Sequence, residues 1–189
     1  MKKVINSILI LAVIVGSFAF TTPSKKEVKA SESTVNWSGS KITGKTHTGT
    51  LGLKSGFLEM DGANITGGEF VVDMTAMTST DMEGEYADKL IGHLKSDDFF
   101  GVANHPTATL KINKTKKTDD GYKVGADITI KGKTEHISFT LVMHGDSASA
   151  KLSFDRSKFD VKYGSGSFFD NLGDKTISDT IELEVNLKF

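Results

Sequence analysis

The sequence predicts an all-β fold, in which about eight antiparallel strands close into a barrel and one short amphipathic helix is inserted between them. Three observations favour this fold. From residue 34 onward, apolar residues recur with a period of two, as in strands that bury one face. Gly-rich and Asp-Gly turn signals separate the runs, as in an antiparallel meander. Thr is frequent and only 2 prolines occur, which suits strands that are paired along their length.

Eight strands are enough for an antiparallel sheet to close into a barrel that holds one small ligand. A sandwich of two packed sheets would show the same period-two pattern. Periodicity alone therefore leaves both architectures open.

The N-terminus predicts a signal peptide and a polar leader over residues 1–30. Two lysines precede the apolar run from Val4 to Phe20, as in secretory signals. Small residues favour cleavage after residue 19 or after residue 30. The alternative is an uncleaved anchor, because such a run lies at the lower limit for a membrane span. We expect a periplasmic or secreted protein with one domain over residues 31–189 and no permanent membrane anchor after cleavage.

Composition excludes several classes of protein. The chain has no Cys, which rules out disulfides, thiolate metal sites and a lipid-modified Cys. The first 30 residues carry five lysines and one glutamate, so the chain from Ser31 has 18 basic and 23 acidic residues. This acidic balance, without a basic stripe, argues against nucleic-acid binding.

The alternating runs predict the strands in chain order. Their apolar positions are Val35 and Trp37; Phe70, Val72 and Met74; Leu110 and Ile112; Ala126, Ile128 and Ile130; Ile137, Phe139, Leu141 and Met143; Leu152 and Phe154; and Ile181, Leu183, Val185, Leu187 and Phe189. The predicted turns are Asp61-Gly62, Gly67-Gly68, Asp119-Asp120-Gly121, Lys131-Gly132-Lys133 and Gly145-Asp146.

One segment, Thr80 to Lys95, has the period of a helix. Tyr86, Leu90 and Leu94 are spaced by four residues and form an apolar stripe. Thr80 and Glu83 have the spacing of a capping box. We expect this helix to cover a barrel mouth or a sheet edge.

No catalytic or metal-binding constellation is evident. The five histidines show neither the His-x-His nor the His-x-x-x-His spacing of metal ligands, and no Gly-x-Ser-x-Gly elbow occurs. We therefore predict a protein that is not an enzyme, with no metal and no cofactor other than a bound lipid or quinone.

The loop from Tyr163 to Gly173 contains the run GSGS but lacks the Lys-Ser/Thr ending of a nucleotide loop. One interpretation is an ordered connection whose Phe168, Phe169 and Leu172 pack against the body. The other is a mobile lip whose aromatic side chains contact a ligand.

Several blocks together resemble the YceI-like polyisoprenoid-binding family. They are GHLKSDDFF at residues 92–100, HPTATL at 105–110, GADITIKGKT at 125–134 and DRSKFDV at 155–161. The chain departs from the family pattern at His105, where the family has Tyr, and at Leu110, where it has an aromatic residue. The opening at residues 35–44 and the long loop at 163–173 also differ.

The resemblance implies a lipocalin-like, extended barrel that holds an isoprenoid or other long-chain apolar ligand, such as a quinone tail or polyprenyl compound, for transport, storage or sequestration. The apolar faces and the resemblance together predict the ligand-binding residues Phe70, Val72, Met74, Leu90, Leu94, Phe99, Ile128, Ile130, Phe139, Leu141, Met143, Leu152, Phe154, Phe168, Leu183 and Val185.

Two other functions remain open at this stage. The chain could be an envelope stress or structural protein whose barrel is filled by side chains. It could also be an enzyme that acts on an apolar substrate with His47 or His93 as its base. Whether two chains pair as a homodimer is open as well.

Overall fold

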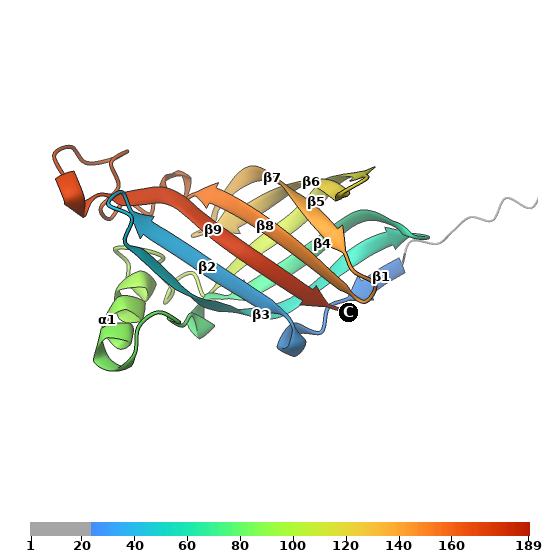
Figure 1. Cartoon of the computed structure of the whole chain (residues 1–189), viewed down its shortest axis with the longest axis horizontal. Helices are drawn as coiled ribbons and strands as arrows, with labels where there is room; N and C mark the ends of the chain where they lie inside the picture. The colour runs from blue at the N-terminus through green and yellow to red at the C-terminus, as the bar shows by residue number, and fades with distance from the viewer. Residues whose placement is uncertain (1–23) are drawn as a thin grey trace, which may run out of the picture.

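A computed structural model describes residues 24–189, and the predicted signal sequence lies outside this range. The described chain contains nine strands, one α-helix and four short 3₁₀ helices (Figure 1). The strands are β1 (Ser24–Glu27), β2 (Thr34–Lys41), β3 (Thr46–Asp61), β4 (Asn64–Asp73), β5 (Thr107–Thr118), β6 (Gly121–Ile130), β7 (Lys133–Met143), β8 (Ser147–Asp155) and β9 (Ile177–Lys188). The helix α1 spans Gly84–Lys95, and the 3₁₀ helices are η1 (Ala30–Glu32), η2 (Met74–Ala76), η3 (Arg156–Phe159) and η4 (Gly173–Lys175).

Strands β2 to β9 form a closed, eight-stranded antiparallel barrel. The sheet runs in the order β3-β2-β9-β8-β7-β6-β5-β4, and β4 pairs with β3 to close it. The predicted barrel is therefore confirmed, and the sandwich alternative is not what forms. Closure depends on the length of β3, whose residues 46–51 pair with β2 and whose residues 52–61 pair with β4.

Sequence periodicity did not reveal β3, although β3 is the longest strand. A register shift between Leu53 and Ser55 marks a bulge in its pairing with β4. Before the bulge, Leu51 and Leu53 line the interior; beyond it, Leu58 is fully buried, so the inward positions change from odd to even numbers. The short strand β1, which pairs with residues 57–60 of β3, was also missed and precedes the predicted domain start at residue 31.

Four of the five predicted turns connect strands as expected, but Gly67-Gly68 is wrong as a turn because it lies inside β4. A Cβ atom on Gly68 would lie 2.7 Å from the carbonyl oxygen of Phe57 on β3. Gly68 is therefore needed for the close approach of two strands and not for a change of direction.

The predicted helix exists but begins four residues later than expected, at Gly84. The predicted capping box is wrong, because Glu83 makes no side-chain cap and the Thr80 hydroxyl contacts the Thr48 hydroxyl at 3.0 Å. Tyr86 is 72% exposed and does not belong to the buried stripe, whereas Leu90 and Leu94 face the barrel interior.

Residues 78–81 form a strap that follows β3 beyond the end of β4. The backbone N–H groups of Thr78 and Thr80 donate to the carbonyls of Thr50 (3.0 Å) and Thr48 (2.9 Å). The indole Nε1 of Trp37 donates to the Thr78 carbonyl at 3.1 Å. The two backbone bonds supply donors to carbonyl groups on the edge of β3 that β4 leaves unpaired. Together with the Trp37 bond, they hold the chain that leads into α1 against the end of the barrel.

The strap requires a glycine at position 49. A Cβ atom there would lie 1.9 Å from the carbonyl oxygen of Thr78 and 2.6 Å from the ring of Trp37. We expect Gly49→Ala to lower the free energy of unfolding by about 1–3 kcal/mol, measured by urea denaturation.

The matched control is Gly92→Ala on α1, where a Cβ atom would meet no neighbour within 4 Å. This change should raise the free energy of unfolding by about 0.5–1 kcal/mol, because Ala is the better helix former. Equal urea midpoints for Gly49→Ala and the unsubstituted protein would contradict the account of the strap.

Candidate ligand-binding cavity

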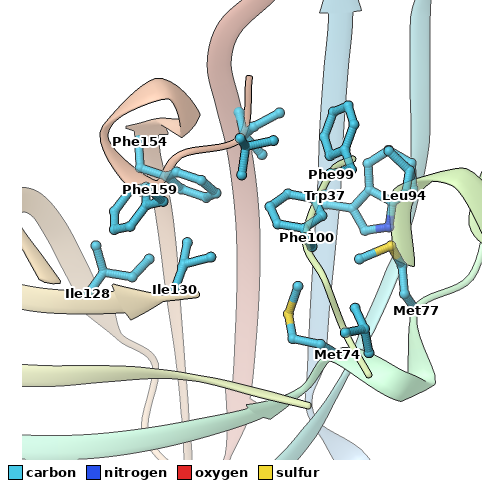
Figure 2. Packing of buried hydrophobic residues seen from close by; sticks show 13 residues of the cluster. Trp37, Met74, Met77, Leu94, Phe99, Phe100, Ile128, Ile130, Phe154 and Phe159 are labelled. Carbon is cyan, nitrogen blue, oxygen red and sulfur yellow. The ribbon is translucent and has the colours of Figure 1, made fainter. Parts of the chain in front are cut away.

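The side chains that face the barrel interior form two buried clusters, one toward α1 and one toward β1. Figure 2 shows the first, in which Phe99, Phe100 and Trp37 lie across from Phe154 and Phe159. The second cluster contains residues such as Leu58, Ile65, Phe70, Ile112, Tyr122 and Leu141. Ile137 and Leu183 pack against both clusters, so the interior is continuous along the barrel.

A cavity of about 310 Å³ passes between these clusters, and residues from all eight barrel strands line it. Its wall is almost entirely apolar, from Trp37 and Phe99 near α1 to Ile112 and Leu187 in the second cluster. The barrel is therefore not filled by its own side chains, which the structural-protein alternative would require. Cavities of this volume and character are typical of small-molecule binding sites.

Fourteen of the sixteen predicted ligand-binding residues line this cavity. They are Phe70, Val72, Met74, Leu90, Leu94, Phe99, Ile128, Ile130, Phe139, Leu141, Leu152, Phe154, Leu183 and Val185. Their contact with a ligand stays a prediction. Met143 is not in the lining, since it ends β7 and packs beside the second cluster. Phe168 is not in it either; its ring is 41% exposed and lies under the ammonium group of Lys162.

Other lining residues were missed. Leu51 and Leu53 belong to β3, which the bulge concealed, and Phe100 and Met77 lie in irregular segments that flank α1. Trp37 could have been found, because it shares the alternating face that predicted β2.

The polar part of the lining lies at the α1 end. Apart from Thr109, the polar side chains come from α1, the loop after β8, and the β2–β3 hairpin with its adjoining strand ends; they are Ser40, Lys41, His47, His93 and Tyr163. Figure 1 shows these elements together at one end of the barrel, around its mouth. A ligand with an apolar chain and a polar end would therefore be oriented with its polar end at this mouth.

A contact between His47 and Asp81 holds the strap at the mouth. The Nδ1 atom of His47 lies 2.7 Å from Oδ2 of Asp81, while the backbone N–H of Thr48 and the hydroxyl of Ser79 donate to Oδ1 at 3.0 Å each. Partial burial alone would raise the pKa of Asp81. The hydrogen bonds from Thr48, His47 and Ser79 outweigh it and lower the pKa from 3.8 to about 2.

Because the folded-state pKa of Asp81 is depressed, its stabilisation is fully present above pH 3.8 and is lost as the pH falls toward 2. Between pH 4 and pH 2, we expect the free energy of unfolding to fall by about 1 kcal/mol less in Asp81→Asn than in the parent protein, after allowance for solvent screening. Urea denaturation at each pH measures this. Asp146→Asn, at a side chain that is 93% exposed, is the control. If the free energy of unfolding of Asp81→Asn changed with pH in the same way as that of the parent protein, the stabilising role of the Asp81 carboxylate would be refuted.

Arg156 organises the loop on the other side of the mouth. Its side chain is fully buried, and it donates to the carbonyls of Val161, Tyr163, Ile177 and Ser178 at 2.9–3.2 Å. Burial lowers the pKa of Arg156, and the carboxylates of Asp179 and Asp155 oppose this effect. The guanidinium remains charged, since arginine is not deprotonated in proteins.

Asp179 extends this network into the loop. Its Oδ1 atom lies 3.3 Å from the guanidinium, and its Oδ2 accepts from the hydroxyls of Ser165 (2.9 Å) and Ser167 (2.6 Å). The loop is therefore an ordered connection. The prediction that Phe168 and Phe169 pack against the body is wrong, because their side chains are 41% and 50% exposed.

We expect Arg156→Met to lower the free energy of unfolding by about 3–5 kcal/mol, because it leaves the Asp179 carboxylate without its buried partner and four carbonyls without a donor. Urea denaturation measures this, and limited proteolysis should show faster cleavage within residues 162–176. Lys151→Met, which breaks an exposed pair with Glu184, should change stability by less than about 0.5 kcal/mol. A similarly small effect of Arg156→Met would remove the role assigned to this network.

In the range of residues 24–189, no three His, Asp or Glu side chains converge in a way that could hold a metal ion. The one helix in the range is too short and too polar to cross a membrane.

Comparison with known proteins gives a consistent result. A family model for the YceI-like domain matches residues 27–189. The crystal structure of Burkholderia cenocepacia BcnA aligns with a TM-score of 0.64 at 19% identity, over 85% of this chain and 98% of that one. A polyisoprenoid-binding domain from Saccharophagus degradans, implicated in plant cell wall breakdown, aligns with a TM-score of 0.60 at 16% identity, over 88% and 99%. No curated protein matches the chain. At these identities the solved structures establish the shared fold.

Proposed function

The chain belongs to the YceI-like domain family, and we propose that it binds a long apolar chain of the isoprenoid type inside its barrel. The observation that carries the proposal is the apolar cavity, which continues between both core clusters and is lined by all eight barrel strands. The structural relative from Saccharophagus degradans is described as a polyisoprenoid-binding domain, which supports this class of ligand.

The energetics of burial permit a flexible chain to bind in the cavity. Each buried CH₂ group contributes roughly 0.8 kcal/mol, so about ten buried carbons supply enough to offset the ordering of a flexible chain. The thioether side chains of Met74 and Met77 line the cavity and can adjust to the irregular outline of a branched chain.

The proposal includes export and carriage, and no chemical step. The predicted signal peptide would deliver the protein to the periplasm or the medium, where an apolar chain needs shielding from water. Cleavage after residue 19 would retain β1, whereas cleavage after residue 30 would remove it. The pairing of β1 with β3 and the bond from Lys29 N–H to the Lys188 carbonyl (2.7 Å) favour the first site.

Filling the cavity tests the proposal. Ala108 on β5 lines it, so Ala108→Phe places a ring in the space that the chain would occupy. We expect this variant to bind an offered C20 isoprenoid alcohol at least about tenfold more weakly than the parent protein, because loss of about two buried carbons already costs that much. Displacement of a fluorescent apolar probe measures the affinity.

The matched control is Lys111→Phe, which adds the same ring to an exposed position on the same strand. It should bind like the parent protein, and circular dichroism should show that both variants are folded. Failure of the parent protein to take up any isoprenoid, or equal binding by Ala108→Phe, would refute binding inside the barrel.

A further inference from the structure

One nitrogen at the cavity mouth lacks a hydrogen-bond partner. Among residues 24–189, two buried side-chain polar atoms accept or donate no hydrogen bond: Nε2 of His93 and Oδ1 of Asp179. The Asp179 oxygen lies 3.3 Å from the guanidinium of Arg156, so its charge is compensated. The His93 nitrogen has no such neighbour. Buried polar atoms are nearly always satisfied, so an exception calls for an explanation.

The surroundings of His93 are aromatic. Its ring meets Tyr163 edge-on with centroids 4.4 Å apart, and it meets Phe99 edge-on at 5.7 Å. All three residues line the cavity. The helix α1 and the loop that Arg156 organises therefore hold the imidazole in place by ring packing, while its Nε2 atom makes no hydrogen bond.

We propose that His93 Nε2 binds the polar end of the apolar ligand, and that this end is a single uncharged hydroxyl or carbonyl group. This inference rests on the proposed function. A neutral imidazole nitrogen accepts a hydrogen bond from a hydroxyl in one tautomer and donates one to a carbonyl in the other. The apolar chain then extends from α1 toward the second core cluster.

The charges at the mouth favour an uncharged end over a diphosphate. Lys41 is the one lysine or arginine in the described cavity lining, and His47, the other histidine there, is engaged by Asp81. Arg156 is occupied by four carbonyls and Asp179. Diphosphates are usually bound by several cations or by backbone N–H groups at a helix N-terminus, whereas His93 lies in the last turn of α1.

The geometry predicts selectivity as well as affinity. A site with a buried polar atom discriminates against a ligand that lacks the matching group, because that atom then stays unpaired. Apolar burial would be the same for a hydrocarbon and for its alcohol. The difference in their affinities therefore isolates the contribution of His93.

The test compares three C20 probes: geranylgeraniol, the hydrocarbon of the same skeleton without the hydroxyl, and geranylgeranyl diphosphate. We expect the protein to bind the alcohol about tenfold more tightly than the hydrocarbon. His93→Phe keeps the edge contacts with Tyr163 and Phe99 but removes the nitrogen, so it should lose this preference and keep its affinity for the hydrocarbon. His136→Phe, at an exposed residue paired with Asp127, should keep the preference.

A spectroscopic measurement separates ligand contact from a structural role. In protein labelled with ¹⁵N-histidine, the Nε2 resonance of His93 should shift when the alcohol binds and should shift much less with the hydrocarbon. Equal binding of alcohol and hydrocarbon, parallel weakening of both in His93→Phe, or tightest binding of the diphosphate would overturn the inference. Absence of binding by all three probes would instead overturn the proposed function.

Discussion

The buried guanidinium of Arg156 is the interaction on which the open end of the barrel depends. It joins the start of β9 to the loop that follows β8, by bonds to the carbonyls of Ile177 and Ser178 on one side and Val161 and Tyr163 on the other. No lysine could do this, because four carbonyls need the fixed fork of donors that a guanidinium provides. With these carbonyls in place, the side chains of Tyr163 and Ile177 reach the cavity wall.

The opposite side of the mouth is fixed by different means. There the strap at residues 78–81 completes the edge of β3, Trp37 bonds to it, and Gly49 leaves room for it. The Arg156 guanidinium lies 5.2 Å from the centre of the Phe99 ring. Phe99 belongs to the same buried cluster as Trp37, which donates to the strap. The barrel thus has an ordered, partly polar mouth and an apolar interior, which is the arrangement that an amphipathic chain requires.

The sequence was most informative where one face of a strand is buried without interruption. The alternation in β6, β7 and β9 predicted both their location and six of the fourteen predicted residues that line the cavity. It failed at β3, because the bulge after Leu53 exchanges the inward and outward positions. The capping-box spacing was misleading at Thr80, whose hydroxyl bonds to a strand far away in sequence instead of capping α1. Local propensity carries no information on such tertiary partners.

The Arg156 network was hidden for the same reason. The sequence predicts that a single arginine in a charged segment lies on the surface. The partners of Arg156 are backbone carbonyls, and no sequence pattern predicts such contacts. The unpartnered nitrogen of His93 is likewise a property of the assembled mouth. The sequence offered His93 only as one of two candidate bases in the alternative enzyme hypothesis, whereas the structure leaves its Nε2 atom buried and without a hydrogen-bond partner.

Binding of a long apolar chain in the cavity is tested most directly by mass spectrometry of lipid extracted from the protein after purification, without detergent, from the cells that make it. We expect one class of apolar chain with a single uncharged polar end, in near-stoichiometric amount. Protein that carries no such molecule, and takes up none when isoprenoids are offered, would contradict binding of such a chain.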